Sequence, residues 1–283
     1  MISLEEKPKI DCLQVIKKAQ RKIARLDAEV ILAWLLGIAR AELYVYQQEI
    51  NREILQRFDM FVRRRADGEP LQYIIGKTEF MGLEFIVTKE VFIPRPETEL
   101  LVEKTIEIAR TFTRPVILDI GTGCGNIAIA LTKFIADCKI KSSEVSKEAL
   151  CIANTNAQLN GVDKNIEFIL SDLFENLPDI RYNIIVSNPP YVASSEIGRL
   201  AKEISFEPPI ALDGGADGLD FYRRLLREAR RFLSNRGFLI LEVGFGQRNG
   251  VEMLLQKYNF HNILFYPDYN NIMRIAIAQW NPL

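Results

Sequence analysis

The chain has 283 residues, of which 48% are hydrophobic and 26% charged, the composition of a globular protein with one or two domains. Its 36 basic and 37 acidic residues nearly balance, which argues against a surface built throughout for nucleic acid. The single histidine, His261, cannot supply a two-histidine iron site or a Cys/His zinc finger, so we predict no metal site.

The compartment is also indicated by the sequence. No apolar run approaches the roughly 20 residues of a membrane-spanning helix. The first residues are acidic and polar, whereas a signal peptide begins basic and continues apolar. The four cysteines never show CxxC spacing and are expected to be reduced, buried thiols. We therefore expect a cytoplasmic protein with no membrane partner.

Apolar residues recur at helical spacing from about residue 15 to residue 65, with almost no glycine or proline. Asp27 is placed to open one helix and Gly37 to close it, which favours several short helices. Basic residues gather at 17–25 and 63–65, and solvated helix faces are their simplest interpretation. We predict a helical domain over residues 1–75.

The pattern changes after Pro70, and residues 76–97 are predicted to form a linking β-hairpin around a Met-Gly-Leu turn. The hairpin ends in a Pro-Arg-Pro loop at residues 94–96. These prolines can cap the next helix, expected over 98–111, with Glu97 and Glu99 favourable at its positive end.

From residue 98 to 283 short strands alternate with helices, which predicts an α/β domain with a mostly parallel sheet covered on both faces. The close spacing of the last two strands predicts an antiparallel pair. The predicted strands are 116–120, 139–144, 166–172, 182–188, 237–244, 262–268 and 271–280.

A glycine-rich loop follows the first of these strands. Gly121, Gly123 and Gly125 lack Cβ atoms where the chain turns, so a ligand could lie directly against the backbone. The third glycine comes one residue earlier than in the GxGxxG pattern of dinucleotide folds. Glu144 ends the second strand about 20 residues later, where a carboxylate can accept hydrogen bonds from both ribose hydroxyls.

A second motif, Asn188-Pro189-Pro190-Tyr191, follows the fourth strand. The two prolines stiffen the loop and remove two amide donors, so the loop is rich in hydrogen-bond acceptors. The Asn188 side-chain oxygen and the Pro189 carbonyl can each accept one hydrogen of a planar NH2 group, and Tyr191 can lie against its face. We predict a site for an amide or aromatic amine nitrogen.

Together with Glu144, the segments DIGTGCG, NPPY, FIPRPETE, ANTNAQLNGV and FEPPIALDGGADGLDFY resemble the HemK or PrmC family over nearly the whole chain. These proteins are bacterial release-factor glutamine methyltransferases. The resemblance implies an N-terminal helical, substrate-docking bundle, a linking hairpin and a seven-stranded, Rossmann-like methyltransferase domain. It also implies methyl transfer from S-adenosylmethionine to the glutamine amide in the Gly-Gly-Gln (GGQ) motif of class I peptide chain release factors.

The same resemblance suggests roles for individual residues. The loop Gly121-Thr122-Gly123-Cys124-Gly125 would hold the methionine part of the cofactor and Glu144 its ribose, while Asp172 and Leu173 would flank the adenine. Asp is commoner than Glu at position 144, and some members place an aromatic residue at position 173. The residues that would hold the glutamine and carry the reaction are Asn188, Pro189, Pro190 and Tyr191, with Asn188 also next to the cofactor.

Phe92 and Arg95 are expected to line the entrance through which the release factor reaches the site.

Two other enzymatic functions stay open. A glutamine methyltransferase of a ribosomal protein would share both motifs. An N6-adenine methyltransferase could use NPPY for a flipped base, although no target-recognition domain or strongly basic balance supports direct nucleic-acid binding. A binding module that has lost turnover is disfavoured by the intact motifs.

Overall fold

The computed structural model describes residues 11–46 and 49–281 and divides them into two compact units. The first contains the residues up to Gly76 together with Lys202–Phe206, and the second contains the rest. Residues 1–10, 47–48, 282 and 283, which the predicted domains include, lie outside the described residues. Within the described ranges, no helix combines the length and apolar character needed to cross a membrane.

The first unit is helical, as the apolar spacing predicts. Its helices pack around a core that includes Ile31, Leu32 and Phe58. Asn51 caps one of them by accepting a hydrogen bond from the Ile54 N–H at 2.8 Å. The elements are α1 (Cys12–Ala19), α2 (Arg25–Leu36), the 3-10 helix η1 (Arg40–Tyr44), α3 (Arg52–Ala66) and α4 (Leu71–Ile75).

Two details of this unit differ from the prediction. Gly37 ends α2 in the left-handed conformation with a φ of 67°, but Asp27 does not open the helix, which begins at Arg25. Asp27 instead pairs with Arg65, whose guanidinium also reaches Glu203 at 2.5 Å. The expected basic face at residues 63–65 is therefore partly neutralised by ion pairs.

The second unit begins with an antiparallel hairpin of β1 (Lys77–Phe80) and β2 (Leu83–Ile86), which turns through Met81 and Gly82. Helix α5 (Pro96–Ala109) follows, with Pro96 in its first turn. Glu99 of this turn accepts a hydrogen bond from the Met81 N–H at 2.7 Å, so the hairpin turn is tied to the helix.

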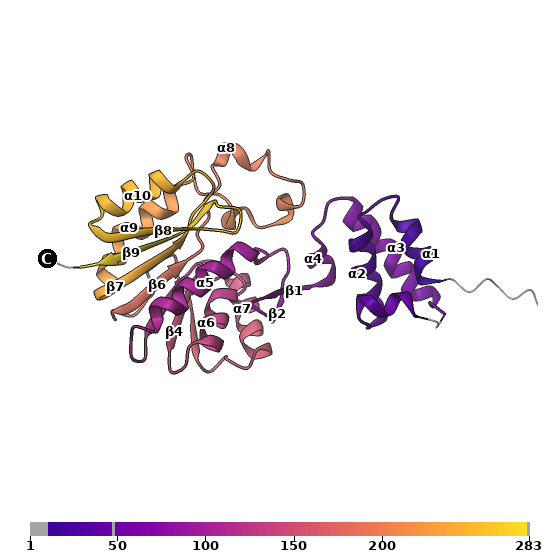
Figure 1. The fold of residues 1–283 in the computed structure, drawn as a ribbon, viewed down its shortest axis with the longest axis horizontal. Coiled ribbons are helices and arrows are strands. Elements are labelled where there is room, and N and C mark those ends of the chain that lie inside the picture. Colours follow the sequence, from indigo (N-terminus) through magenta and orange to yellow (C-terminus); the bar gives the residue numbers. More distant parts are fainter. Residues whose placement is uncertain (1–10, 47–48, 282–283) are drawn as a thin grey trace, which may run out of the picture. The chain divides into compact units, whose positions relative to one another are not determined.

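The main sheet has seven strands in the order β5-β4-β3-β6-β7-β9-β8 (Figure 1). Strands β3 to β7 are parallel, and β9 is antiparallel to both of its neighbours. This confirms the predicted α/β fold with an antiparallel final pair. The strands are β3 (Val116–Ile120), β4 (Lys139–Glu144), β5 (Ile166–Leu170), β6 (Tyr182–Ser187), β7 (Leu233–Glu242), β8 (Phe260–Pro267) and β9 (Met273–Trp280).

Helices cover both faces of this sheet. Since parallel crossovers are right-handed, α6 and α7, which lead outward from β3 to β5, lie on the face opposite to α9, which leads from β6 to β7. Helix α5 packs beside α6, and α10 packs beside α9. The bounds of these helices are α6 (Asn126–Phe134), α7 (Lys147–Leu159), α9 (Asp220–Phe232) and α10 (Arg248–Lys257).

A long connection leaves the sheet after β6 and carries the short helices α8 (Ser194–Ile197), η2 (Ile204–Phe206) and η3 (Pro209–Ala211). The chain returns beside its own start, where Val192 donates to the Leu212 carbonyl and Gly214 donates to the Val192 carbonyl. No secondary structure is predicted for this segment from the sequence.

Candidate active site

The predicted motifs meet at the carboxyl ends of neighbouring strands, β4, β3 and β6. The strand order reverses between β3 and β6, which is where ligands bind in open α/β sheets. Ser187, at the end of β6, donates its hydroxyl hydrogen to the Ile120 carbonyl at 2.7 Å. Gly121 in turn donates to the Ser143 carbonyl of β4 at 2.9 Å. These hydrogen bonds hold the starts of three loops together.

The glycine loop presents its backbone rather than its side chains. Gly121 and Gly123 have φ values of 73° and 55°, and a Cβ on either would meet nothing within 4 Å. At Gly125 a Cβ would lie only 3.2 Å from the Cβ of Ala153, so this glycine allows the loop to pack on α7. The side chains of Thr122 and Cys124 are buried.

Asp119 supports this loop from inside the protein. Its Oδ2 accepts hydrogen bonds from the Thr122 hydroxyl at 2.6 Å and from the Ser142 hydroxyl at 3.1 Å. Burial raises the pKa of Asp119 to about 6, and the hydrogen bonds from both hydroxyls oppose that rise. Burial likewise raises the pKa of the Cys124 thiol to about 12, so this cysteine is a packing residue and not a nucleophile.

Glu144 is buried at the end of β4, next to the glycine loop. Its Oε1 accepts hydrogen bonds from the N–H groups of Val145 and Ser146, and its Oε2 accepts one from the Gly123 N–H at 2.9 Å. A carboxylate has about four acceptor positions, so one position on Oε2 remains for a ligand hydroxyl. Glu144 thus orients the loop and can also bind.

Strand β5 ends at Leu170, two residues before the predicted end, and Asp172 and Leu173 follow after Ser171, which donates its N–H to the Glu144 carbonyl of β4 at 2.8 Å. Asp172 is paired with Arg224 of α9 at 2.7 Å. Leu173 has a φ of 51° and packs its side chain into the core of the sheet. Its side chain is therefore buried rather than displayed at the strand end.

The Asn188–Tyr191 loop leaves two acceptors unused. Asn188 donates from Nδ2 to the Thr98 hydroxyl at 3.1 Å. Among the described residues, no donor is hydrogen-bonded to Asn188 Oδ1 or to the Pro189 carbonyl. Tyr191 is half-buried against the core, and burial raises the pKa of its hydroxyl. The loop can therefore accept two hydrogen bonds from a ligand.

Residues far from the motifs in sequence complete this region. Asn156 of α7 is fully buried and accepts from the Ile86 N–H at 2.7 Å, while its NH2 group donates to the carbonyls of Ile86 and Cys124. It joins the hairpin to the glycine loop. The sequence analysis did not identify it, although it lies in the ANTNAQLNGV segment.

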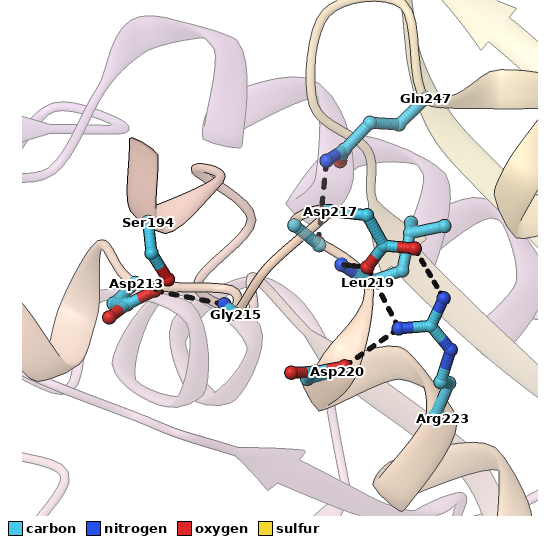
Figure 2. A network of polar contacts seen from close by, with 9 residues as sticks. Ser194, Asp213, Gly215, Asp217, Leu219, Asp220, Arg223 and Gln247 are labelled. Carbon is cyan, nitrogen blue, oxygen red and sulfur yellow. Dashed lines mark hydrogen bonds and ion pairs between the residues drawn. The ribbon is translucent and has the colours of Figure 1, made fainter. Parts of the chain in front are cut away.

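Gln247 holds the other side of the Asn188–Tyr191 loop. Its Nε2 donates to the Tyr191 carbonyl at 2.7 Å and reaches the Gly218 carbonyl at 3.3 Å. Figure 2 shows Gln247 pointing toward the turn that contains Asp217 and Leu219. Asp217 is itself paired with Arg223, which lowers the pKa of Asp217 to about 2. The turn is thus fixed by ion pairs at the surface.

Phe92 and Arg95 lie in the loop that leads into α5. The Arg95 guanidinium lies over the Phe92 ring, 4.6 Å from its centroid, and pairs with the buried carboxylate of Glu207. Glu207 also accepts a hydrogen bond from the Ile93 N–H at 3.2 Å. Arg95 thus has a structural partner in addition to any contact with a substrate.

Three other residues lie away from these loops. His261 is exposed on β8, the edge strand of the sheet. Cys151 of α7 is exposed and Cys138 is half-buried, so the prediction that all four cysteines are buried is wrong for Cys151 and only partly right for Cys138.

The glycine loop fits a cofactor that lies against bare backbone. At Gly121 and Gly123 the space that a Cβ would fill is open, and the free acceptor position of Glu144 lies beside the second of these glycines. The neighbouring loop adds the unused oxygens of Asn188 and Pro189. Together these groups suit a ligand with hydroxyl groups next to a second ligand with an NH2 group.

Comparison with known proteins agrees with this arrangement. Residues 12–76 match the PrmC N-terminal domain, and residues 96–207 match the methyltransferase small domain. A release factor glutamine methyltransferase of Geobacter sulfurreducens is 40% identical over 255 residues, which cover 89% of this chain and 88% of that protein. One of Buchnera aphidicola is 36% identical and covers 90% and 91%.

Among solved structures, the hMettl16 catalytic domain in complex with an RNA hairpin has a TM-score of 0.60 at 16% identity. The match covers 89% of this chain and 95% of that one. At this level of identity the likeness supports the methyltransferase fold alone.

Proposed function

Because the chain belongs to the release factor glutamine methyltransferase family, we propose that it methylates the side-chain amide nitrogen of the glutamine in the GGQ motif of class I release factors. The methyl donor is S-adenosylmethionine. The observation that carries the proposal is the pair of free acceptors, Asn188 Oδ1 and the Pro189 carbonyl, next to the glycine loop. This substrate also places the reaction in the cytoplasm, where translation ends.

The cofactor would lie on the glycine loop, with Gly121 and Gly123 against its methionine part and Glu144 accepting from a ribose hydroxyl. Asp172, at the end of the next strand, would lie toward its adenine. When bound, S-adenosylmethionine supplies a methyl group already activated by the positive sulfur, so the protein needs no group to activate the donor.

The protein must make the amide nitrogen a better nucleophile, because its lone pair is delocalised. Asn188 Oδ1 and the Pro189 carbonyl would each accept one hydrogen of the glutamine NH2 group. Both bonds strengthen as positive charge develops on that nitrogen, which stabilises the transition state more than the bound substrate. The stiff proline loop holds the acceptors in place beforehand. As the bond from nitrogen to the methyl carbon forms, the sulfur–methyl bond would break and leave a neutral thioether, and the methylated nitrogen would release one proton to water, so no histidine base is required.

The test uses the full-length protein and labelled S-adenosylmethionine with four substrates. These are an intact class I release factor, its GGQ→GGA variant, a glutamine-containing ribosomal protein and duplex DNA. We expect label on the intact release factor only, and peptide mass spectrometry should place one added methyl group on the GGQ glutamine. Label on the GGA variant, on the ribosomal protein alone or on DNA alone would overturn the proposal.

A further inference from the structure

Three polar side chains from different elements form one line of hydrogen bonds behind the Asn188–Tyr191 loop. Asn188 Nδ2 donates to Thr98 Oγ1 at 3.1 Å, and Thr98 Oγ1 donates to Glu242 Oε2 at 2.7 Å. Thr98 lies in the first turn of α5, and Glu242 is the last residue of β7. Both side chains are buried, so a loop residue is joined to two rigid elements.

The line has a direction because the Thr98 hydroxyl has a single hydrogen. An ionised carboxylate only accepts, so this hydrogen points to Glu242 and a lone pair of Oγ1 faces Asn188. The side of the Asn188 amide that faces Thr98 must then be its NH2 group. Its oxygen, Oδ1, then lies on the opposite side of the amide, where no described residue donates a hydrogen bond to it.

We infer that Glu242, acting through Thr98, is a positioning residue that keeps Asn188 Oδ1 turned toward the substrate. This rests on the proposed function, in which Oδ1 accepts a hydrogen from the glutamine NH2 group. If the Asn188 amide were rotated by half a turn, its NH2 group would face the NH2 group of the glutamine and could not accept that hydrogen bond.

The surroundings of Glu242 make the direction of the line depend on pH. The groups facing it are Thr98 and Glu97 of α5, Arg274 of β9, Tyr191 of the loop, and Tyr222 of α9, whose hydroxyl donates to the Glu242 carbonyl at 2.8 Å. Burial raises the pKa of Glu242 to about 7, opposed by the Thr98 hydrogen bond and the charge of Arg274. A protonated Glu242 can donate to Thr98, which frees the Thr98 hydrogen for Asn188 Oδ1 and favours the rotated amide.

The first test compares kinetics of four full-length variants on the release factor. Thr98→Val keeps the shape but removes the hydroxyl, and we expect kcat to fall about 10- to 100-fold, with cofactor Kd within about twofold of wild type. Thr98→Ser restores the hydroxyl and should recover most of kcat. Thr105→Val is the matched control, since Thr105 is an equally buried threonine of α5 whose hydroxyl donates to the Leu101 carbonyl of its own helix. It should leave kcat unchanged.

For Glu242→Gln, the fourth variant, kcat is measured as a function of pH. Wild-type kcat should fall as pH drops below about 7, and this acidic limb should be absent in Glu242→Gln. A structural role alone would not remove one limb of a pH profile while leaving the protein folded.

The second test does not depend on the release factor. The Asn188 NH2 resonances, assigned by their loss in Asn188→Asp, should shift in Thr98→Val, return in Thr98→Ser and titrate with a midpoint near 7 in the wild type. If these shifts occur but no glutamine is methylated, the line of hydrogen bonds stands and the proposed function fails.

The positioning role is overturned if wild type methylates the release factor and Thr98→Val has the same kcat as wild type. It is also overturned if Thr98→Val and Thr105→Val lose equal activity. The same holds if the Asn188 NH2 resonances shift neither in Thr98→Val nor with pH.

Discussion

The side-chain NH2 group of Gln247 donates a hydrogen bond to the main-chain carbonyl of Tyr191, with 2.7 Å between Nε2 and the oxygen. Gln247 directly precedes α10, while Tyr191 ends the loop that carries the two unused acceptors. The Gln247 side chain thus helps to hold the far end of the loop, where the Tyr191 side chain is also hydrogen-bonded to Glu242, and the near end is held by Ser187 and Thr98.

Replacing Gln247 by Leu should release the far end of this loop. The Tyr191 carbonyl would lose its partner, and we expect the free energy of unfolding to fall by about 1–3 kcal/mol. Methyl transfer should slow while cofactor affinity stays close to wild type, because Gln247 donates to the carbonyls of Tyr191 and Gly218, which lie outside the glycine loop. Gln256→Leu, at an exposed position of α10, is the control. Equal kcat values for the two variants would contradict this role.

Gly218→Ala should disturb the same loop by steric overlap. Gly218 has a φ of 76°, and a Cβ there would overlap the Tyr191 carbonyl oxygen. Gly246 has the same φ of 76° but nothing within 4 Å of its Cβ position. Gly246→Ala therefore measures the backbone strain alone, about 1 kcal/mol, and Gly218→Ala should cost about 1–3 kcal/mol more. Chemical denaturation of both variants checks this, and equal losses would show that the overlap is absent.

Asn188→Ala should separate catalysis from cofactor binding. One of the two acceptors for the substrate NH2 group is lost, and we expect kcat to fall about 10²- to 10³-fold while the cofactor Kd changes little. Asn183→Ala is the matched control at the opposite end of β6, where the Asn183 side chain accepts from the Val116 N–H at 2.8 Å. The control should lower stability but not kcat. Unchanged turnover in Asn188→Ala would exclude the proposed clamp.

The strands and the two loops could be predicted because their signals are local. The Val116–Ile120 and Lys139–Glu144 strands match the predicted bounds, as each is a short run between turn residues. Strand β7 begins at Leu233, four residues before the predicted start, because Leu233 already pairs with Tyr182 of β6 while the turn-type residues at 234–237 form an irregularity inside the strand. The helix α4 is too short for its periodicity to be recognised.

The contacts behind the site could not be predicted in the same way. Thr98 and Glu242 are 144 residues apart and meet only because α5 packs on β7. Glu242 nevertheless has the same kind of position in the sequence as Glu144, because each is a carboxylate at the end of a strand. Each of these strands lies next to a strand that is followed by one of the two predicted ligand loops. The partners of Asn156 and Gln247 are main-chain groups, which carry no sequence signal at all.

Asn156→Ala should loosen the glycine loop from the hairpin. Three main-chain groups, in Ile86 and Cys124, would lose their partner in a fully buried position, so we expect a loss of about 2–4 kcal/mol in the free energy of unfolding. Asn154→Ala, exposed on the same helix, should change it by less than about 0.5 kcal/mol. Similar losses in both variants would mean that the buried contacts contribute little.

Glu242 should make stability decrease with rising pH. Burial raises its folded-state pKa from the usual 4.5 to about 7, so between these values the folded protein binds more protons than the unfolded chain. The favourable contribution of Glu242 to the free energy of unfolding is complete below pH 4.5 and is lost as pH rises through 7. At about 1.36 kcal/mol per pKa unit, this shift corresponds to about 3 kcal/mol. Relative to wild type, Glu242→Gln should therefore gain stability between pH 5 and pH 8, as measured by denaturant unfolding. Subtracting the variant cancels the similar contribution of Asp119, and Glu175→Gln, at an exposed position, controls for the loss of one carboxylate. A stability difference between Glu242→Gln and wild type that stays constant over this range would show that Glu242 is ionised throughout.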